Sequence, residues 1–193
     1  YVIDTENKRA LHYAGQHDFF HVPFQPPFSP EDYQDAISQT ALQNPSVIVI
    51  DSMSHEHEGI GGVLEMHDEE VERLSRGDEN RRNSVSTAAW IRPKAARRKL
   101  LNQIIQTDCH FIFCFRANEK LDWKKKDSRN QPVDLGFQPV AAKEFVYEMT
   151  AMALFQPAAN GVPDWRPTIR GEQGLVKLPN YMQDIFKDGR QID

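Results

Sequence analysis

The stretch Val47-Ile48-Val49-Ile50-Asp51-Ser52 decides the fold. Its four consecutive β-branched residues form an apolar run in which polar and apolar positions do not alternate. This pattern predicts a strand buried on both faces, which is typical of a parallel sheet covered by helices. The run closes with an acid and a hydroxyl, so polar groups are expected at the end of a central strand.

Two further apolar runs are expected to lie in the same sheet. Tyr1-Val2-Ile3-Asp4 is interpreted as a short buried strand that ends in an acidic turn, and Cys109 to Phe115 as a fully apolar strand followed by Arg116. Shorter strand-like pieces are expected at 10–14, 19–22, 150–155 and 165–169.

Helices are expected between these strands. Ser29-Pro30-Glu31-Asp32 supplies an N-cap, a proline at the first helical position and two acids in the first turn, so a helix should run to about Gln43. A longer helix is expected over 86–106, with a possible break at Pro93. The alternation of strand and helix predicts an α/β sheet with crossover helices.

The remaining segments are polar. Residues 52–83 carry glycines and an acidic helical stretch near 64–74, and residues 121–140 are basic and then polar, which favours an exposed loop. A helix turn is expected near Phe145 and a terminal helix over 180–187. The whole chain, 1–193, is therefore expected to form one core in which 52–83 and 121–140 are insertions.

Composition limits the class of protein. The chain has 193 residues, of which 39% are hydrophobic and 26% charged, so it suits one domain or slightly more and is too apolar for a disordered tail. The net charge of -5 argues against a protein that coats nucleic acid over its whole surface, while leaving room for local basic patches. The two cysteines lie inside an apolar run, which favours reduced, buried thiols and a cytosolic protein.

The ends of the chain carry two more expectations. No apolar run approaches the ~20 residues that a membrane-spanning helix needs, and no signal peptide opens the sequence. Because Tyr1 begins directly in a strand without a preceding methionine, the start is interpreted as cut from a longer chain.

Charged and hydroxyl-bearing residues follow each of the three strong strands. Asp4-Thr5-Glu6 follows the first, Asp51-Ser52 closes the second, and Arg116 follows the third. In open parallel sheets, ligands bind beyond the carboxyl ends of the strands. Two acids, hydroxyls and a cation at one edge are the groups that a magnesium–ATP site requires.

A family resemblance adds to this reading. Val47 to Ser52 resembles the Walker B strand of RecA-like ATPases, and Tyr1 to Glu6 resembles the strand after the P-loop helix. The run from Asp51 to Gly62, rich in histidine and glycine, is similar to that of phage-encoded AAA/RecA-like ATPases associated with recombination and replication. A tryptophan-bearing helix around Trp90 and the strand Phe113-Cys114-Phe115-Arg116-Ala117 follow in the family's order, so the likeness covers roughly 1–156.

The resemblance implies a three-layer P-loop NTPase fold with a mainly parallel central sheet flanked by helices. It also implies ATP and Mg²⁺ as cofactors and a ring or filament of identical chains as the assembly. The family's Gly-x-x-x-x-Gly-Lys-Ser/Thr loop is absent from the 193 residues and is expected upstream of Tyr1. Gly59-Ile60-Gly61-Gly62 does not replace it, because no Lys-Ser/Thr follows.

The resemblance also assigns roles to the strand-end residues. Glu6 is expected to orient the attacking water, although Asp4 remains an alternative as the more inward acid. Asp51, with Ser52, is expected to hold Mg²⁺ through its water shell. Arg116 is expected to offset charge on the γ-phosphate, as a sensor or as a finger acting on a neighbouring subunit, and Lys120 is a second candidate cation.

A basic segment favours contact with nucleic acid. Cations next to an aromatic ring that can stack a base suit single-stranded DNA, and the candidate residues are Trp123, Lys124, Lys125, Lys126 and Arg129. A second basic run, 92–99, is expected on a helix. The resemblance also implies that the insertions 52–83 and 121–140 face DNA or a partner. The alternative for both runs is a solvated helix face and a soluble loop tip.

Histidines near the central strand leave a metal site open. His55, His57, Glu58 and His67 are residue types that bind zinc, but a His-x-His pair on a loop lacks a convincing set of partners, and a loop over the nucleotide or a DNA path is the favoured interpretation. A metal-dependent nuclease that uses His55, His57 and Asp51 is the third hypothesis.

The preferred hypothesis is an ATPase of phage-type recombination or replication that acts on single-stranded DNA in the cytoplasm, that of the bacterial host if the gene belongs to a phage. The alternative is a non-hydrolysing module that binds nucleic acid or a partner on the same fold.

Overall fold

The computed structural model describes residues 1–126, 130–165 and 177–186, and it divides the chain into two compact units, Tyr1–Arg116 and Ala117–Asp193. The expected single core over 1–193 differs from this division. The parallel sheet ends with the strand that precedes Arg116, and the next strand pairs only with its own hairpin partner.

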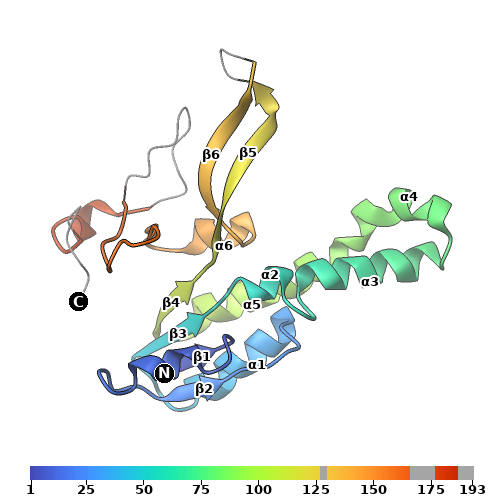
Figure 1. The fold of residues 1–193 in the computed structure, drawn as a ribbon. Helices are drawn as coiled ribbons and strands as arrows, with labels where there is room; N and C mark the ends of the chain where they lie inside the picture. The colour runs from blue at the N-terminus through green and yellow to red at the C-terminus, as the bar shows by residue number, and fades with distance from the viewer. Residues whose placement is uncertain (127–129, 166–176, 187–193) are drawn as a thin grey trace. The chain divides into compact units, whose positions relative to one another are not determined.

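The first unit contains a four-stranded sheet in which all neighbours are parallel (Figure 1). The strand order is β2-β1-β3-β4, and the bounds are β1 Val2–Asp4, β2 His21–Pro23, β3 Val47–Asp51 and β4 His110–Cys114. The register places Asp4, Asp51 and Cys114 side by side at the last position of neighbouring strands. The expected α/β class with a parallel sheet flanked by helices is confirmed.

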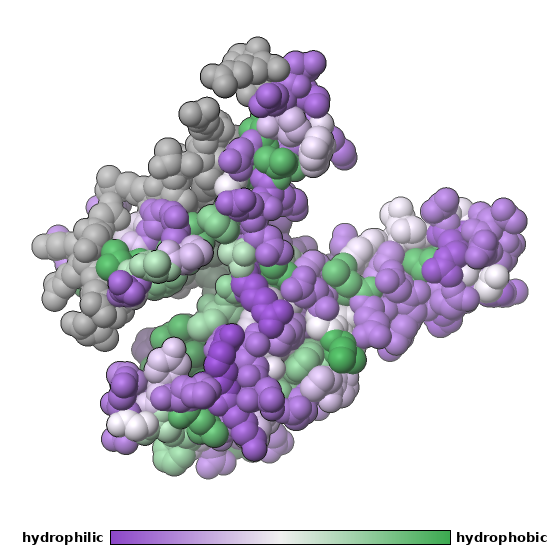
Figure 2. Space-filling view, in the orientation of Figure 1, coloured by the Kyte–Doolittle hydropathy of each residue, from purple (hydrophilic) through white to green (hydrophobic). Residues whose placement is uncertain are grey.

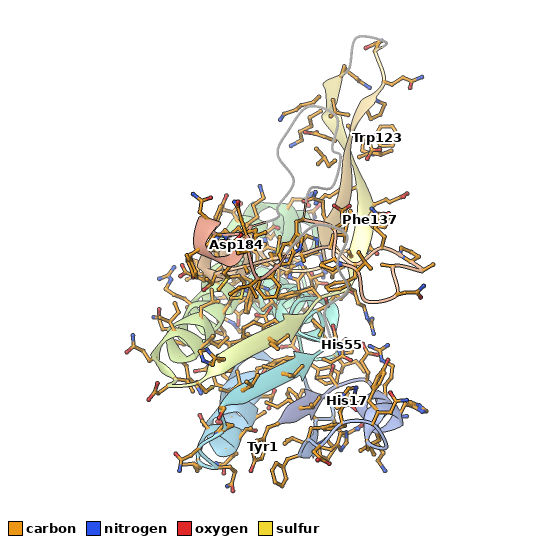
Figure 3. All side chains as sticks on the ribbon, turned by 90° about the vertical axis from the view of Figure 1, so that its left-hand side faces the viewer. Tyr1, His17, His55, Trp123, Phe137 and Asp184 are labelled. Atoms are coloured by element: carbon orange, nitrogen blue, oxygen red, sulfur yellow. The ribbon has the colours of Figure 1, made fainter. Side chains whose placement is uncertain are left out.

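Helices connect these strands, with bounds α1 Pro30–Ala41, α2 His55–Glu58, α3 Val63–Ser75, α4 Glu79–Ala89 and α5 Ile91–Gln106. The predicted start of α1 is confirmed, because Ser29 Oγ accepts the N–H of Asp32 while the Asp32 side chain accepts the N–H of Ser29. α1 and α5 lie side by side against one face of the sheet (Figures 1 and 3).

The segment expected as a polar insertion over 52–83 is mostly helical. α3 confirms the acidic helix expected near 64–74, and α4 follows it in an antiparallel pair that forms a long arm (Figure 1). The arm carries mainly hydrophilic side chains (Figure 2). Glycine permits the tight passage from α2 to α3, since a Cβ at Gly62 would lie 2.7 Å from the His55 carbonyl oxygen.

Two local predictions were wrong in the first unit. The helix expected over 86–106 breaks at Trp90 rather than at Pro93, because Pro93 falls in the first turn of α5, where a missing N–H costs no helical hydrogen bond. Residues 10–14, expected as strand-like, belong to the 3-10 helix Arg9–Tyr13, called η1, which is entered through Lys8 in the left-handed region at φ 69°.

Burial across the sheet is one-sided rather than two-sided. Ile48 and Ile50 are fully buried, whereas Val49 is only partly buried and Ile112, its neighbour in register, is 53% exposed. Helices α1 and α5 cover one face, so side chains that alternate along a strand meet unequal surroundings. For the same reason Cys114 is exposed rather than buried, although both cysteines are free thiols as expected.

The second unit begins with an antiparallel hairpin, β5 Ala117–Lys126 and β6 Pro132–Pro139, followed by α6 Lys143–Glu148 and the short 3-10 helix η2 Asn180–Met182. The interpretation of 121–140 as a loop was wrong. The sequence of β5 is largely charged and shows no alternation of apolar residues, so it gave no signal for a strand. The strand is stabilised by its backbone pairing with β6.

Other expectations for this unit are mixed. The helix turn near Phe145 is confirmed by α6. In place of the strand over 150–155 there are two isolated bridges, Met152 with Lys177 and Leu154 with Asp164. The strand expected over 165–169 falls, beyond Trp165, outside the described residues, and the terminal helix over 180–187 is confined to η2 within the described part. None of the described helices has the length and hydropathy to cross a membrane.

Candidate functional site

The expected strand-end residues meet at one edge of the sheet. Glu6 lies two residues after β1, Asp51 closes β3 and Arg116 lies two residues after β4. Arg116 Nη2 lies 2.6 Å from Glu6 Oε1, so residues 110 positions apart in sequence form an ion pair. The Glu6 side chain is 14% exposed and that of Arg116 is 48% exposed. These two side chains therefore lie together at the carboxyl ends of the strands, and with Asp51 we call them the strand-end cluster.

Arg9 completes the cluster and was missed by the sequence analysis. Its Nη2 lies 3.2 and 3.3 Å from the two carboxylate oxygens of Asp51, and its Nη1 lies 3.8 Å from Glu6 Oε2. Residues 10–14 were interpreted as part of a strand, which hid the turn that brings Arg9 back over the sheet edge. Arg9 could have been found from the sequence, because it is a cation only a few residues after two acids at a strand end.

Asp4 is buried, and its carboxylate bonds to the loop after β1 and to His21 rather than to the strand-end cluster. Its carboxylate accepts the N–H of Glu6 at 2.7 Å and the N–H of Ala10 at 3.0 Å, and it lies 3.0 Å from His21 Nε2. Burial raises the pKa of Asp4, but the hydrogen bonds from His21, Ala10 and Glu6 outweigh it and lower the pKa overall. Asp4 thus fixes the loop that carries Glu6, which favours Glu6 as the acid that faces a ligand.

The two hydroxyl residues at the strand ends bind each other through the backbone. Ser52 donates its N–H to Thr5 Oγ1 at 2.7 Å, and its carbonyl accepts the Tyr33 hydroxyl at 2.8 Å. Ser52 is buried, and its own Oγ accepts the N–H of Ser54 at 3.2 Å. The peptide that joins Asp51 to Ser52 is cis. Because Ser52 is buried, its side chain points into the protein, whereas the Asp51 side chain is 25% exposed.

His55 lies beside the carboxyl ends of the strands (Figure 3). Its ring contacts Thr5 on one side and approaches Glu6 on the other. Its Nδ1 lies 2.8 Å from Thr5 Oγ1, its Nε2 lies 3.7 Å from Glu6 Oε1, and its ring stacks on Phe28 with centroids 4.8 Å apart. Burial lowers the pKa of His55, the charge of Arg116 lowers it further, and nearby acids oppose the shift. His55 is therefore neutral at pH 7.

The other histidines of the proposed zinc cluster lie in different surroundings. His57 Nδ1 lies 3.0 Å from Arg97 Nη2. His67 stacks on Trp90 with centroids 4.1 Å apart, and its Nε2 lies 3.1 Å from the Ser86 carbonyl oxygen. Glu58 is exposed on α2. Within the described ranges, no three side chains of His, Cys, Asp or Glu are grouped as a metal would require.

The expected nucleic-acid residues belong to the second unit. Lys120 and the run from Trp123 to Lys126 lie on β5, and Trp123 is 70% exposed on the hairpin (Figure 3). Arg129 lies outside the described residues. An exposed indole in a run of lysines presents an aromatic face and positive charge together.

The basic run at 92–99 is not one continuous surface. Arg97 is buried and pairs with Glu56 at 2.9 and 3.0 Å, and Arg92 Nη1 lies 2.9 Å from Glu70 on α3. Arg97 is therefore removed from the surface, whereas Arg92 is paired but 66% exposed. The expectation of a basic helix face holds for exposed members of the run such as Arg98 and Lys99.

Asp51 supplies carboxylate oxygens of the kind that hold Mg²⁺ through its water shell. Both of these oxygens bond to the Arg9 guanidinium in this structure, so Arg9 would have to move away before Asp51 could hold the metal. No family model matches the chain, and neither a curated protein nor a solved structure is similar enough to count as a match.

Proposed function

We propose that this chain contributes the strand-end half of an ATP-hydrolysing site on a RecA-like P-loop fold, and that the protein acts on single-stranded DNA in phage-type recombination or replication. One observation carries the proposal. Three adjacent parallel strands bring the acids Glu6 and Asp51 and the cation Arg116 to one edge, where ligands of open α/β sheets bind. The resemblance of 1–156 to phage AAA/RecA-like ATPases gives that edge its chemistry.

The side chains divide the work. Glu6 accepts a hydrogen bond from the attacking water and aims it at the γ-phosphorus. Asp51 holds the metal's water shell, and Mg²⁺, when bound, neutralises charge on the phosphate oxygens. Arg116 donates to the γ-phosphate. Because Arg116 and Glu6 pair within one chain, a sensor role in the same subunit is favoured over a finger that reaches into a neighbour.

The proposal requires a segment outside these residues. The phosphate-gripping Gly-x-x-x-x-Gly-Lys-Ser/Thr loop does not occur in the sequence, and the backbone N–H groups of such a loop cradle the phosphates in this fold. The experiment therefore uses the full reading frame of the gene. Assembly into a ring or filament belongs to the same proposal.

ATP turnover of that protein tests the proposal. Glu6→Gln keeps the shape but not the base, and Asp51→Ala removes the anchor for the metal, so each should lower kcat by about 100-fold or more. The matched controls are Glu69→Gln and Asp35→Ala, two exposed acids on α3 and α1, which should turn over ATP like the parent. Turnover that survives Glu6→Gln and Asp51→Ala at the parent rate would contradict the proposal.

A second candidate function rests on the hairpin. Trp123 and the adjacent lysines suit stacking and phosphate contacts with single-stranded DNA, and this surface is independent of hydrolysis. A non-hydrolysing module that binds nucleic acid or a partner would use this surface alone. Retained DNA binding in a full-length protein without ATP turnover would favour it.

Fluorescence anisotropy with a labelled oligonucleotide tests the DNA surface. Trp123→Ala should weaken binding about 5- to 100-fold, which corresponds to the loss of one stacked base. Lys124→Ala should reduce the slope of log affinity against log salt by roughly 0.7. The matched control is Lys143→Ala, an exposed lysine on α6 outside both basic runs. Equal loss in the control would assign the effect to net charge, and no loss in Trp123→Ala would remove the hairpin from the interface.

A further inference from the structure

His55 lies at the junction of the strand-end residues. It is the first residue of α2, four positions after the end of β3, and its side chain is 13% exposed. One ring nitrogen faces Thr5 at the end of β1 and the other faces Glu6 in the loop that follows. The sequence hypotheses assigned this histidine to zinc or to a loop over the nucleotide.

The hydrogen bonds around Thr5 decide which nitrogen of His55 carries the proton. Thr5 Oγ1 already accepts the N–H of Ser52 at 2.7 Å and has one proton to donate. Two acceptors compete for that proton: His55 Nδ1 at 2.8 Å and the Ser52 carbonyl oxygen at 3.2 Å. The carbonyl oxygen has two lone pairs and already accepts the Tyr33 hydroxyl at 2.8 Å, whereas the contact with the imidazole is the shorter of the two. On this difference in distance we assign the Thr5 proton to His55 Nδ1.

The proton of neutral His55 then sits on Nε2. This N–H points towards Glu6 Oε1, 3.7 Å away, which is beyond direct hydrogen-bond length but within the distance that a small rotation of the carboxylate closes. The opposite tautomer would direct a lone pair at a carboxylate, which is repulsive. Glu6 Oε1 also accepts a hydrogen bond from Arg116 Nη2 at 2.6 Å, so His55 and Arg116 approach the same oxygen. The other oxygen, Oε2, lies 3.8 Å from Arg9 Nη1.

Packing fixes the ring in this orientation. The imidazole stacks on Phe28, which is buried, and the N–H of Phe28 donates to the Ile60 carbonyl oxygen at 2.7 Å. The ring is therefore held by an aromatic face on one side and by the Thr5 hydroxyl at one edge. Its other ring nitrogen, Nε2, faces Glu6.

We propose that His55 is a positioning residue for Glu6: a Thr5–His55–Glu6 hydrogen-bond chain directs the Nε2–H of neutral His55 at the carboxylate and holds it towards the water that it orients. The value of His55 to catalysis rests on the proposed function, whereas its contact with Thr5 and the 3.7 Å approach of its Nε2 to Glu6 belong to the fold. When Arg116 turns to the γ-phosphate, His55 keeps Glu6 in place.

Two substitutions separate positioning from packing. In His55→Gln the side-chain amide nitrogen reaches the position of Nε2 and still serves Glu6, whereas in His55→Asn the amide oxygen takes the place of Nδ1 and serves only Thr5. If His55 positions Glu6, His55→Gln keeps kcat within about 3-fold, and His55→Asn lowers kcat by about 10-fold or more with KM unchanged. The control His17→Asn alters an exposed histidine and should leave kcat unchanged.

The reverse order, with His55→Asn active and His55→Gln impaired, would overturn the proposal and assign His55 to anchoring α2 on Thr5. Melting temperatures of both variants show whether either loss is a folding defect.

Nitrogen-15 NMR of the imidazole tests the chain without ATP. The expected spectrum at pH 7.5 shows His55 protonated at Nε2 and unprotonated at Nδ1. A tautomer protonated at Nδ1 would overturn the proposal. If the full-length protein does not turn over ATP but the Nε2–H tautomer is found, the proposed function fails and the hydrogen-bond chain stands, so the two failures are distinguishable.

Discussion

Neutral His55 sits among four charged groups, and the balance between them sets its protonation. Arg116 lowers the pKa of His55 together with burial, which is the larger cause, while Glu6, Glu58 and Asp51 raise it. The net result is a pKa below that of an ordinary histidine. The protein therefore binds this proton more weakly when folded than when unfolded.

The sign of the resulting pH dependence follows directly. Between the lowered pKa of folded His55 and about 6.5 in the unfolded chain, the unfolded state binds more protons, so stability falls as pH decreases through this window. Urea unfolding at pH 7.5 and at pH 5 measures the fall. His55→Gln cannot titrate and should show a smaller fall than the parent. Equal falls in both proteins would contradict the lowered pKa.

Charge removal at the neighbours should move the same pKa in opposite directions. Arg116→Ala removes a repulsive cation and should raise the pKa of His55, whereas Glu6→Gln removes an attractive anion and should lower it. NMR titration of the imidazole measures both. The control Arg98→Ala, an exposed arginine on α5, should leave the pKa unchanged. Shifts of the same sign in both variants would contradict the placement of Arg116 and Glu6 beside His55.

At the scale of elements, α5 ties the helices of the first unit together. Arg97 binds Glu56 on α2, one residue after His55, and Arg92 binds Glu70 on α3. Hydrogen bonds from Arg73 and Arg92 lower the pKa of Glu70 to about 2, so this carboxylate is charged at neutral pH. The contacts at Glu56 are buried, so α2 is held by a pair shielded from water.

The buried pair predicts a large effect of a single substitution. Arg97→Met leaves the Glu56 carboxylate buried without its bidentate guanidinium, which should cost about 3–5 kcal/mol of unfolding free energy. The double variant Glu56→Met, Arg97→Met removes both charges and should recover most of that loss. Urea unfolding measures all three proteins.

The neighbouring Arg98 provides the matched control, because it is exposed on the same helix. Arg98→Met should change stability by no more than about 0.5 kcal/mol. A double variant as unstable as Arg97→Met would contradict the argument, since the loss would then reflect packing and not the removal of a guanidinium from a buried carboxylate.

At the scale of the molecule, the sequence predicted what depends on local patterns. The β-branched run of β3, the Ser29 cap of α1 and the acids at the strand ends each have a signal within a few residues, and each was found at its expected place. Because parallel strands align their carboxyl ends, the approach of Glu6 to Arg116 followed from topology.

Features that depend on distant partners could not be predicted in this way. The strand β5 consists largely of charged residues, and only its pairing with β6 makes it a strand. The contacts of Arg9 and His55 are set by turns whose backbone conformations carry no strong sequence signal. One-sided burial of β4 depends on which face the helices cover, and an apolar run does not record this.

The division of the chain at Arg116 leads to the last prediction. Sixteen of the twenty buried hydrophobic side chains among the described residues belong to the first unit, including the fully buried set Ile3, Tyr33, Ile37, Ile48, Ile50, Val63 and Leu100. A chain that ends after Arg116 keeps this core and the whole parallel sheet. Such a fragment should therefore unfold in one cooperative thermal transition.

A shorter fragment that ends at Gln106 is the control, because it lacks β4. Without β4, the ladder beside Ile48 and Ile50 is lost, and so are the bonds from the Met53 N–H to the Cys114 carbonyl and from the Arg116 N–H to Ser54 Oγ. These bonds hold the turn that leads to His55, so the 1–106 fragment should not unfold cooperatively. Circular dichroism against temperature measures both fragments. A broad, non-cooperative transition for 1–116 would contradict this prediction. It would mean that the strand-end cluster depends on the second unit for its stability.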